Sequence, residues 1–245
     1  MVALDAGRLL MEAGASGHNV DVMVDTVARG LGAERSDFRI GYASLAITIG
    51  IGNASLTAMR KVGHLGVNQQ LDQELRVFAN RIEQGELNAA TARAELDRIV
   101  RETPRHPSWV MAIAVGLACA AFGRLLKLDW LGTGPVFLAA TLGQYVRREL
   151  ATRHVNVFIG AATVAFMSSV VGGLGARWAG SATIPTAMVA SILMLVPGVP
   201  ALNAQTDVLD GRPTLGSARA VWVVVILIFL TAGVWLGQIA LGEGR

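Results

Sequence analysis

The residues most able to do chemistry lie late in the chain, where a run of apolar residues is interrupted by prolines. Within residues 193–203, Pro197 removes a backbone hydrogen-bond donor, Gly198 widens the range of allowed dihedral angles, and Pro200 suits the first turn of a new helix. The spacing predicts a helix that breaks at Pro197 and restarts after it. Broken helices at membrane depth release backbone groups that can bind a solute.

A polar face follows this break. Asn203, Asp207 and Asp210 recur at spacings that place them on one side of a short helix, which we expect to end at Gly211. Carboxylates near a membrane can relay protons, and Arg219 could supply their counter-charge. If Asp207 carries protons, Asp207→Asn abolishes pH-driven flux at normal protein abundance. In the alternative interpretation, the prolines merely end a span at the cytoplasmic surface and the aspartates are solvated beyond it.

Three further polar residues lie within or beside apolar runs. Ser168 and Ser169 could line a solute path or simply form hydrogen bonds between helices. Arg124 and Arg219, together with a helix N-terminus near Pro200, could recognise a carboxylate group. These three residues and the polar face complete the set of substrate-path and proton-path candidates.

The apolar elements that would position these residues are long enough to cross a membrane. Of the 245 residues, 53% are hydrophobic and only 16% are charged, well below the charge usual in soluble domains. A bilayer core needs about 20 apolar residues as helix. Five transmembrane helices are predicted, at about residues 108–128, 130–146, 155–176, 179–199 and 220–241. The second is the shortest, and Arg124 and Lys127 would extend beyond the apolar part of the first.

Basic residues indicate how these spans are oriented. They precede the first span and follow the second: Arg98, Arg101 and Arg105, then Arg147, Arg148 and Arg153. The positive-inside rule places both groups in the cytoplasm. No uninterrupted apolar stretch begins the chain, so the N-terminus is not expected to be exported. We expect a multi-pass protein of the bacterial inner membrane with its N-terminus in the cytoplasm.

Residues 1–105 have the pattern of a small cytoplasmic α/β domain, and residues 106–245 form the transmembrane domain. Helices are predicted for residues 4–13, 20–31, 71–82 and 92–99, with Asn88 as a helix cap. Alternating residues 45–51 predict a strand, followed by a turn at Gly52-Asn53 and a second strand over residues 55–62. The fold class is therefore a membrane protein with an N-terminal α/β domain and a bundle of five helices.

The chain contains no recognisable catalytic constellation. It has no phosphate-binding loop with lysine, no His-Glu-x-x-His motif, and a single cysteine, Cys119, which cannot form a zinc site by itself. His18 with Asp21 and Asp25 could form a metal or acid–base site, but a capping histidine beside a solvated acidic face is the simpler interpretation. No catalytic residue, metal or cofactor is therefore assigned. The N-terminal half has a charge balance of −1, which excludes nucleic acid as its partner.

Several short motifs, in order, carry a resemblance to a known family. They are residues 6–15 (AGRLLMEAGA), Trp109, residues 195–200 (LVPGVP), Asp207 and Gly211. With the soluble-then-membrane layout, they resemble the N-terminal region of the threonine/serine exporter family, over about residues 4–241. The resemblance implies export of threonine, serine or related small hydrophilic metabolites, driven by the proton motive force.

Single-chain members of that family continue with a second set of spans, so this sequence looks like the larger subunit of a split exporter. Similar two-subunit exporters are associated with dicarboxylates, especially succinate. The resemblance therefore implies a small membrane partner subunit, and a homo-oligomer is also compatible with the small residues of the spans. Two other functions stay open: a membrane-anchored enzyme, or a regulatory membrane protein, each using the N-terminal domain.

Overall fold

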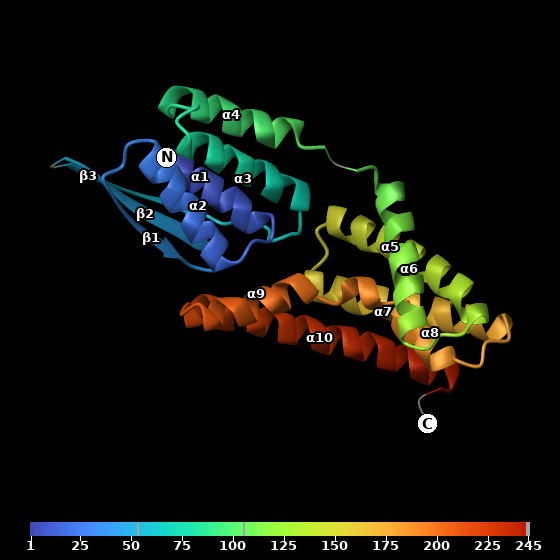
Figure 1. The fold of residues 1–245 in the computed structure, drawn as a ribbon. Helices are drawn as coiled ribbons and strands as arrows, with labels where there is room; N and C mark the ends of the chain where they lie inside the picture. Colours follow the sequence, from blue (N-terminus) through green and yellow to red (C-terminus); the bar gives the residue numbers. More distant parts are fainter. Residues whose placement is uncertain (53, 105, 244–245) are drawn as a thin grey trace. The chain divides into compact units, whose positions relative to one another are not determined.

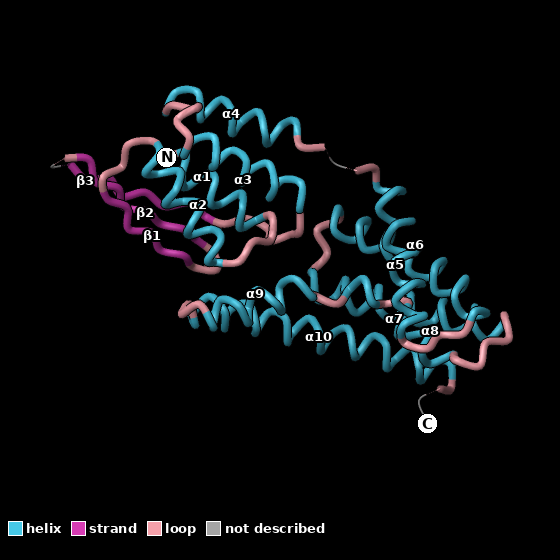
Figure 2. Tube along the Cα trace, viewed as in Figure 1, coloured by secondary structure: helices cyan, strands magenta, loops and turns pink. Residues whose placement is uncertain are grey.

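The computed structural model describes residues 1–52, 54–104 and 106–243. This part of the chain is mostly helical and contains a small three-stranded antiparallel sheet (Figures 1 and 2). It divides into two compact units. The first unit contains residues 1–104 and 198–222, and the second contains the described residues of 106–197 and 223–243. A late segment of the sequence therefore packs with the N-terminal region, which the sequence did not indicate.

The first unit begins with two packed helices, α1 (Val2–Glu12) and α2 (Gly17–Gly30). The Ser16 side chain accepts a hydrogen bond from the Asn19 backbone N–H, which caps the start of α2. Gly7 lets the two helices approach closely, because a Cβ atom at this position would overlap Val24. The apolar faces of both helices are buried.

The sheet packs against these helices (Figure 1). Its strands are β1 (Arg35–Ile40), β2 (Ser44–Ile51) and β3 (Ala54–Lys61), in that spatial order. Phe38 lies opposite Ile47, and Thr48 lies opposite Thr57 with their hydroxyl groups 2.9 Å apart. The buried side chains of β2, Leu45 and Ile47, belong to the same core as α1 and α2. The other face of the sheet is largely open.

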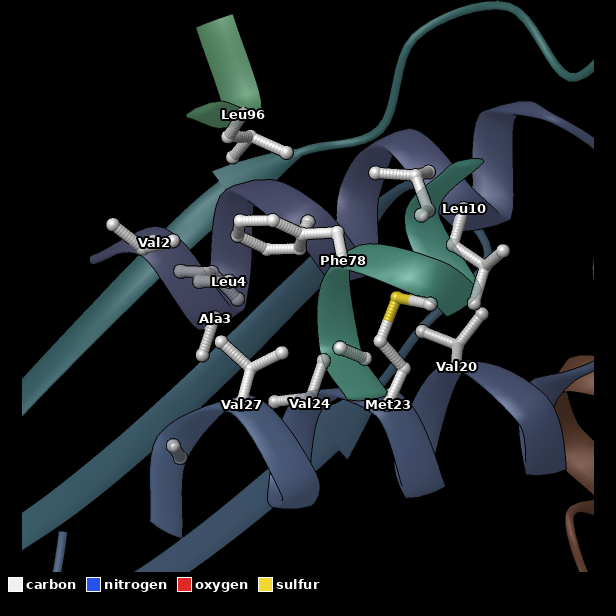
Figure 3. Close-up of a cluster of buried hydrophobic side chains, with 14 of the residues drawn as sticks. Val2, Ala3, Leu4, Leu10, Val20, Met23, Val24, Val27, Phe78 and Leu96 are labelled. Atoms are coloured by element: carbon white, nitrogen blue, oxygen red, sulfur yellow. The ribbon is translucent and has the colours of Figure 1, made fainter. Parts of the chain in front are cut away.

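Two amphipathic helices complete this packing, α3 (Gln69–Glu83) and α4 (Ala89–Glu102). Asn88 forms a capping box with Thr91 at the start of α4, and Asn68 caps α3. Phe78 of α3 and Leu96 of α4 reach a core shared with α1 and α2 (Figure 3). Burying a side chain of this size contributes about 1.5–3 kcal/mol, so the core orders the first unit.

The second unit is helical and rich in small residues at its helix contacts. Its elements are α5 (Ser108–Leu125), α6 (Trp130–Thr152), α7 (Val157–Trp178), α8 (Ile184–Ala190), the short 3₁₀ helix η1 (Leu193–Leu195) and the later part of α10 (Pro213–Leu241). Gly233 of α10 lies against α7, where a Cβ atom would be 2.5 Å from the Ala162 carbonyl oxygen. Gly237 lies against Ser169 in the same way. The small residues of these runs thus allow tight packing within the chain.

Within the described part of the chain, three helices are long and apolar enough to cross a membrane: α5, α7 and α10. A fourth crossing is possible if α8–η1 and α9 (Gly198–Leu209) together count as one broken span. The bundle of five spans is therefore not confirmed. The second predicted span corresponds to α6, whose 23 residues include three charged ones, Arg147, Arg148 and Glu149, near the C-terminal end. The fourth, residues 179–199, is interrupted, because α8 and η1 are short and residues 196–197 separate η1 from α9.

Most elements expected from the sequence are present with shifted ends. The helices at 4–13, 20–31, 71–82 and 92–99 correspond to α1, α2, α3 and α4, and the Asn88 cap is confirmed. The strands at 45–51 and 55–62 correspond to β2 and β3. β1 was not predicted, because its residues include Arg35, Asp37 and Arg39 on the open face. The predicted turn includes Asn53, which lies outside the described residues.

Candidate functional site

The polar face after the proline break lies on α9, and it packs within the first unit. Gly198 and Pro200 fall in the first turn of α9, where proline needs no backbone partner. Gly211, with φ of +76°, separates α9 from the start of α10. At Gly216 a Cβ atom would lie 2.7 Å from the Ala204 carbonyl oxygen, so α9 and α10 pack closely. This short hairpin holds Asn203, Asp207 and Arg219 on the first unit.

Asp207 is completely buried and has two strong partners. Its Oδ2 atom accepts a hydrogen bond from Arg219 Nη1 at 2.6 Å, and its Oδ1 atom accepts one from the backbone N–H of Gly17 at 2.7 Å. Gly17 is the first residue of α2, where a carboxylate is favoured by the helix dipole. Arg219, only 4% exposed, also donates to the Ala15 carbonyl oxygen at 3.1 Å. The buried charges are therefore paired and hydrogen-bonded.

Two further contacts join α9, and the residue just before α10, to the loop before α2 and to α2 itself. Asn203 Nδ2 donates to the Gly14 carbonyl oxygen at 2.7 Å. Arg212 forms an ion pair with Asp21 at 2.5 Å. With Asp207 and Arg219, these contacts connect segments about 190 residues apart in sequence. Asp210 is exposed and stands apart from this cluster.

The remaining predicted residues lie in the second unit and are not brought together. Ser169 donates to the Phe166 carbonyl oxygen at 2.9 Å and faces Gly237, whereas Ser168 faces Gly143 of α6. Arg124 lies in the last turn of α5. Its guanidinium lies 4.2 Å from the Trp130 ring centroid and donates to the Leu128 carbonyl oxygen. Pro197 follows Val196, whose extended backbone interrupts the helical path.

The conceivable acid–base or metal site at His18 is not assembled. Asp21 pairs with Arg212, and Asp25 accepts a hydrogen bond from Ser36 and pairs with Arg29. The Ser36 and Arg29 contacts lower the pKa of Asp25. Among residues 1–52, 54–104 and 106–243, no group of three metal-ligating side chains is close enough to hold an ion.

Comparison with known proteins decides the family. Residues 1–240 match the model of the family ThrE, described as "Putative threonine/serine exporter". The chain belongs to the ThrE family. Together with its apolar helices, this membership makes it a multi-pass membrane protein of a transporter family, and it confirms the resemblance stated from the sequence.

Individual relatives of this ThrE-family chain cover nearly its full length. It is 30% identical over 230 residues to the "Probable succinate transporter subunit YjjP" of Escherichia coli, covering 94% of this chain and 88% of the relative. The same values hold for the protein of that name from Klebsiella aerogenes. An uncharacterized protein of Haemophilus influenzae is 24% identical, covering 98% of this chain and 91% of its own length. No solved structure matches the chain.

In this ThrE-family chain, sequence reasoning missed the partners of the polar face. Gly14, Ala15 and Gly17 lie between the helices predicted at residues 4–13 and 20–31 and were assigned no role. Their backbone groups form hydrogen bonds with Asn203, Arg219 and Asp207, respectively. Gly14 and Gly17 were the available signal for this packing, because glycine lets another segment of the chain approach the backbone closely. Arg147 was used only for orientation, although it donates to the Met194 carbonyl oxygen at 3.2 Å.

Proposed function

We propose that this chain is the larger subunit of a secondary exporter driven by the proton motive force. Its solutes are small hydrophilic metabolites, either threonine and serine or a dicarboxylate such as succinate. The observation that carries this proposal is the family match over residues 1–240. Support for a two-subunit assembly comes from the relatives named as subunits of a succinate transporter. The partner would be a small membrane protein.

In the proposed topology, α5, α6, α7, the broken segment from α8 to the start of α9, and α10 make five crossings of the bacterial inner membrane. The N-terminal region lies in the cytoplasm. Basic residues support this orientation, because Arg98 and Arg101 precede α5 while Arg147 and Arg148 lie near the end of α6. The α9–α10 connection would then also be cytoplasmic.

The N-terminal region would control access to the solute path from the cytoplasm. The supporting contacts are the four that bind α9 and the start of α10 to residues 14–21. Both segments continue directly into proposed crossings. A movement of α2 would therefore be transmitted to the proline break and to the start of α10. The hydrogen bonds of Asp207 and Arg219 would transmit it.

The solute path itself is proposed to follow the break and the small-residue helices. Its candidate residues remain those proposed from the sequence: Pro197, Gly198, Pro200, Asn203, Asp207, Asp210, Arg219, Ser168, Ser169 and Arg124. The family supports a path through the membrane without naming a residue. Asp207 remains the candidate proton carrier.

Efflux from preloaded cells tests this proposal. Cells would be loaded with threonine from a hydrolysable dipeptide, or with succinate, and would express this chain alone or with its partner. We expect efflux that needs this chain and is abolished by a protonophore. If the protein is present in the membrane and neither solute leaves the cells faster than with an empty vector, the exporter function is rejected.

A further inference from the structure

A polar cluster in the second unit lies where α6, α7 and η1 meet. Gly143 of α6 permits this meeting, because a Cβ atom there would overlap both Ser168 Oγ of α7 and the terminal methyl group of Met194 of η1. Met194 lies just before the proline break, in a segment where the helix has already tightened into a single 3₁₀ turn. The hydroxyl group of Ser168 and the side-chain methyl group of Met194 therefore both lie against Gly143.

A cation lies on the same face of α6. Arg147 follows Gly143 by four residues, which is about one helical turn. Its Nη1 atom donates to the Met194 carbonyl oxygen at 3.2 Å. A guanidinium group has five N–H donors arranged in a planar fork, so the bond to Met194 leaves donors for another acceptor. In the sequence, Arg147 indicated only that the end of the second predicted span lies in the cytoplasm.

Two side-chain oxygens are buried without a hydrogen-bond partner in the described residues: Ser168 Oγ on α7, and Gln144 Oε1 on α6, three residues before Arg147. Ser168 as a whole is 2% exposed. Leaving a buried polar group without a hydrogen-bond partner is destabilising, and two other serines of this unit do have partners. Ser169 and Ser191 both donate to backbone carbonyls of their own helices. Ser168 differs from them, as expected of a side chain whose partner is a ligand.

We propose that Arg147 and Ser168 bind the carboxylate group of the exported solute, with Gln144 as a further contact. Arginine forks match the two oxygens of a carboxylate, the Ser168 hydroxyl donates a further hydrogen bond, and the Gln144 amide contacts a second polar group of the same solute. The carboxylate is shared by amino acids and dicarboxylates, so the site suits both. This inference rests on the proposed function.

The proposed topology gives the cluster a position suited to export. The C-terminal end of α6 and the end of η1 would both approach the cytoplasmic surface, where an exporter collects its solute. Arg147 holds the carbonyl oxygen of Met194, three residues before Pro197. A carboxylate that draws Arg147 toward itself would weaken this bond and loosen the backbone at the break. Binding would thus be linked to the segment that the N-terminal region controls.

Direct binding of radiolabelled threonine and succinate to the full chain, purified with its partner subunit, tests this site. We expect the wild type to bind at least one of the two solutes. Arg147→Gln should weaken that binding about tenfold or more, and Arg147→Lys should recover part of the loss because it retains the charge without the fork. Ser168→Ala should weaken binding a few-fold. Arg148→Gln is the matched control and should bind as the wild type does.

Two results would overturn the site: binding of neither solute by the wild type, or equal affinities for Arg147→Gln and Arg148→Gln. Because Arg147 also holds Met194, the thermal midpoint of each variant is measured first. If Arg147→Gln does not fold, Ser168→Ala decides alone, and unchanged affinity rejects the site. Protonophore-sensitive efflux by an Arg147→Gln variant that binds normally would reject the site and leave the exporter. Solute binding that depends on Arg147, without any efflux, would support the site and reject the exporter function.

Discussion

At the residue scale, Asp207 and Arg219 form an ion pair in which both side chains are buried, 2.6 Å apart. Charges removed from water are tolerated only when their remaining hydrogen-bonding capacity is used. Here the Gly17 N–H and the Ala15 carbonyl oxygen supply the additional partners. The pair therefore holds the α9–α10 hairpin against the start of α2. We expect its removal to lower the free energy of unfolding, whether or not Asp207 also carries protons.

We predict that Asp207→Asn lowers the stability of the purified protein, by about 3–5 kcal/mol if Arg219 stays buried without its counter-charge. Arg219→Gln should have a similar effect. The double variant should be more stable than the sum of the two losses implies, because no unpaired charge remains. Thermal unfolding of the four proteins measures this coupling. Strict additivity would show that the ion pair contributes nothing to the docking.

The same variant examines the proton-carrier hypothesis. If Asp207 carries protons, Asp207→Asn should abolish pH-driven flux at normal protein abundance. If Asp207 serves only in the ion pair, the same variant should lower the abundance of the protein. Flux per molecule of protein in the membrane separates the two effects. Unchanged flux per molecule, at any abundance, would exclude Asp207 from the proton path.

Glu95 of α4 gives the first unit a pH dependence that can be measured. Arg98 and Arg81 donate to its carboxylate at 2.8 Å and 2.5 Å and lower its pKa to about 2. A depressed folded-state pKa means that Glu95 adds stability above its unfolded pKa of about 4.3. This stability is lost as the pH falls from there toward 2.

We therefore expect Glu95→Gln to lower the unfolding midpoint at pH 7 and to reduce its decline between pH 5 and pH 3. Glu102→Gln is the control, because that side chain is 60% exposed and also pairs with Arg98. A midpoint for Glu95→Gln that falls with acid as steeply as in the wild type would contradict the prediction.

At the scale of elements, the start of α2 fits tightly against the α9–α10 hairpin. A Cβ atom at Gly17 would lie 2.9 Å from Asp207 Oδ1, 2.9 Å from Leu215 Cδ2 and 3.1 Å from Arg212 Cδ. Alanine is otherwise favourable in a helix. Any loss caused by Gly17→Ala must therefore come from this contact between elements.

We predict that Gly17→Ala destabilises the protein by about 1–3 kcal/mol, the usual cost of overpacking, and that it slows efflux. Gly134→Ala on α6 is the matched control, because its Cβ atom would meet nothing within 4 Å. Unfolding midpoints and efflux rates of the two variants would be compared. A Gly17→Ala protein as stable as the control would show that the hairpin can separate from α2 without cost.

The sequence predicted elements better than their assembly. Periodicity located α1 to α4, and the Asn88 cap followed from local chemistry. The bonds from Asn203 to Gly14 and from Arg219 to Ala15 join residues 189 and 204 positions apart. No periodicity reports such pairing. β1 was not predicted because Arg35, Asp37 and Arg39 alternate with its apolar residues, and only the opposite face of the strand is partly buried.

At the scale of the whole molecule, the number of crossings decides which ends share a side of the membrane. Five crossings place residue 1 and residue 243 on opposite sides, whereas four place them on the same side. We predict opposite sides, with the N-terminus in the cytoplasm. Reporters active only in one compartment, fused at each end in separate proteins, test this. Equal activity of the cytoplasmic reporter at both ends would contradict the five-span topology.

Transport by purified protein tests the central claim most directly. The chain and its partner would be reconstituted into liposomes, and solute movement would be followed after a pH gradient is imposed, with threonine and succinate in separate preparations. We predict movement of at least one solute that is driven by the gradient, abolished by a protonophore and absent without this chain. Solute movement that is indifferent to the gradient, or equal in liposomes lacking the chain, would contradict a proton-driven exporter.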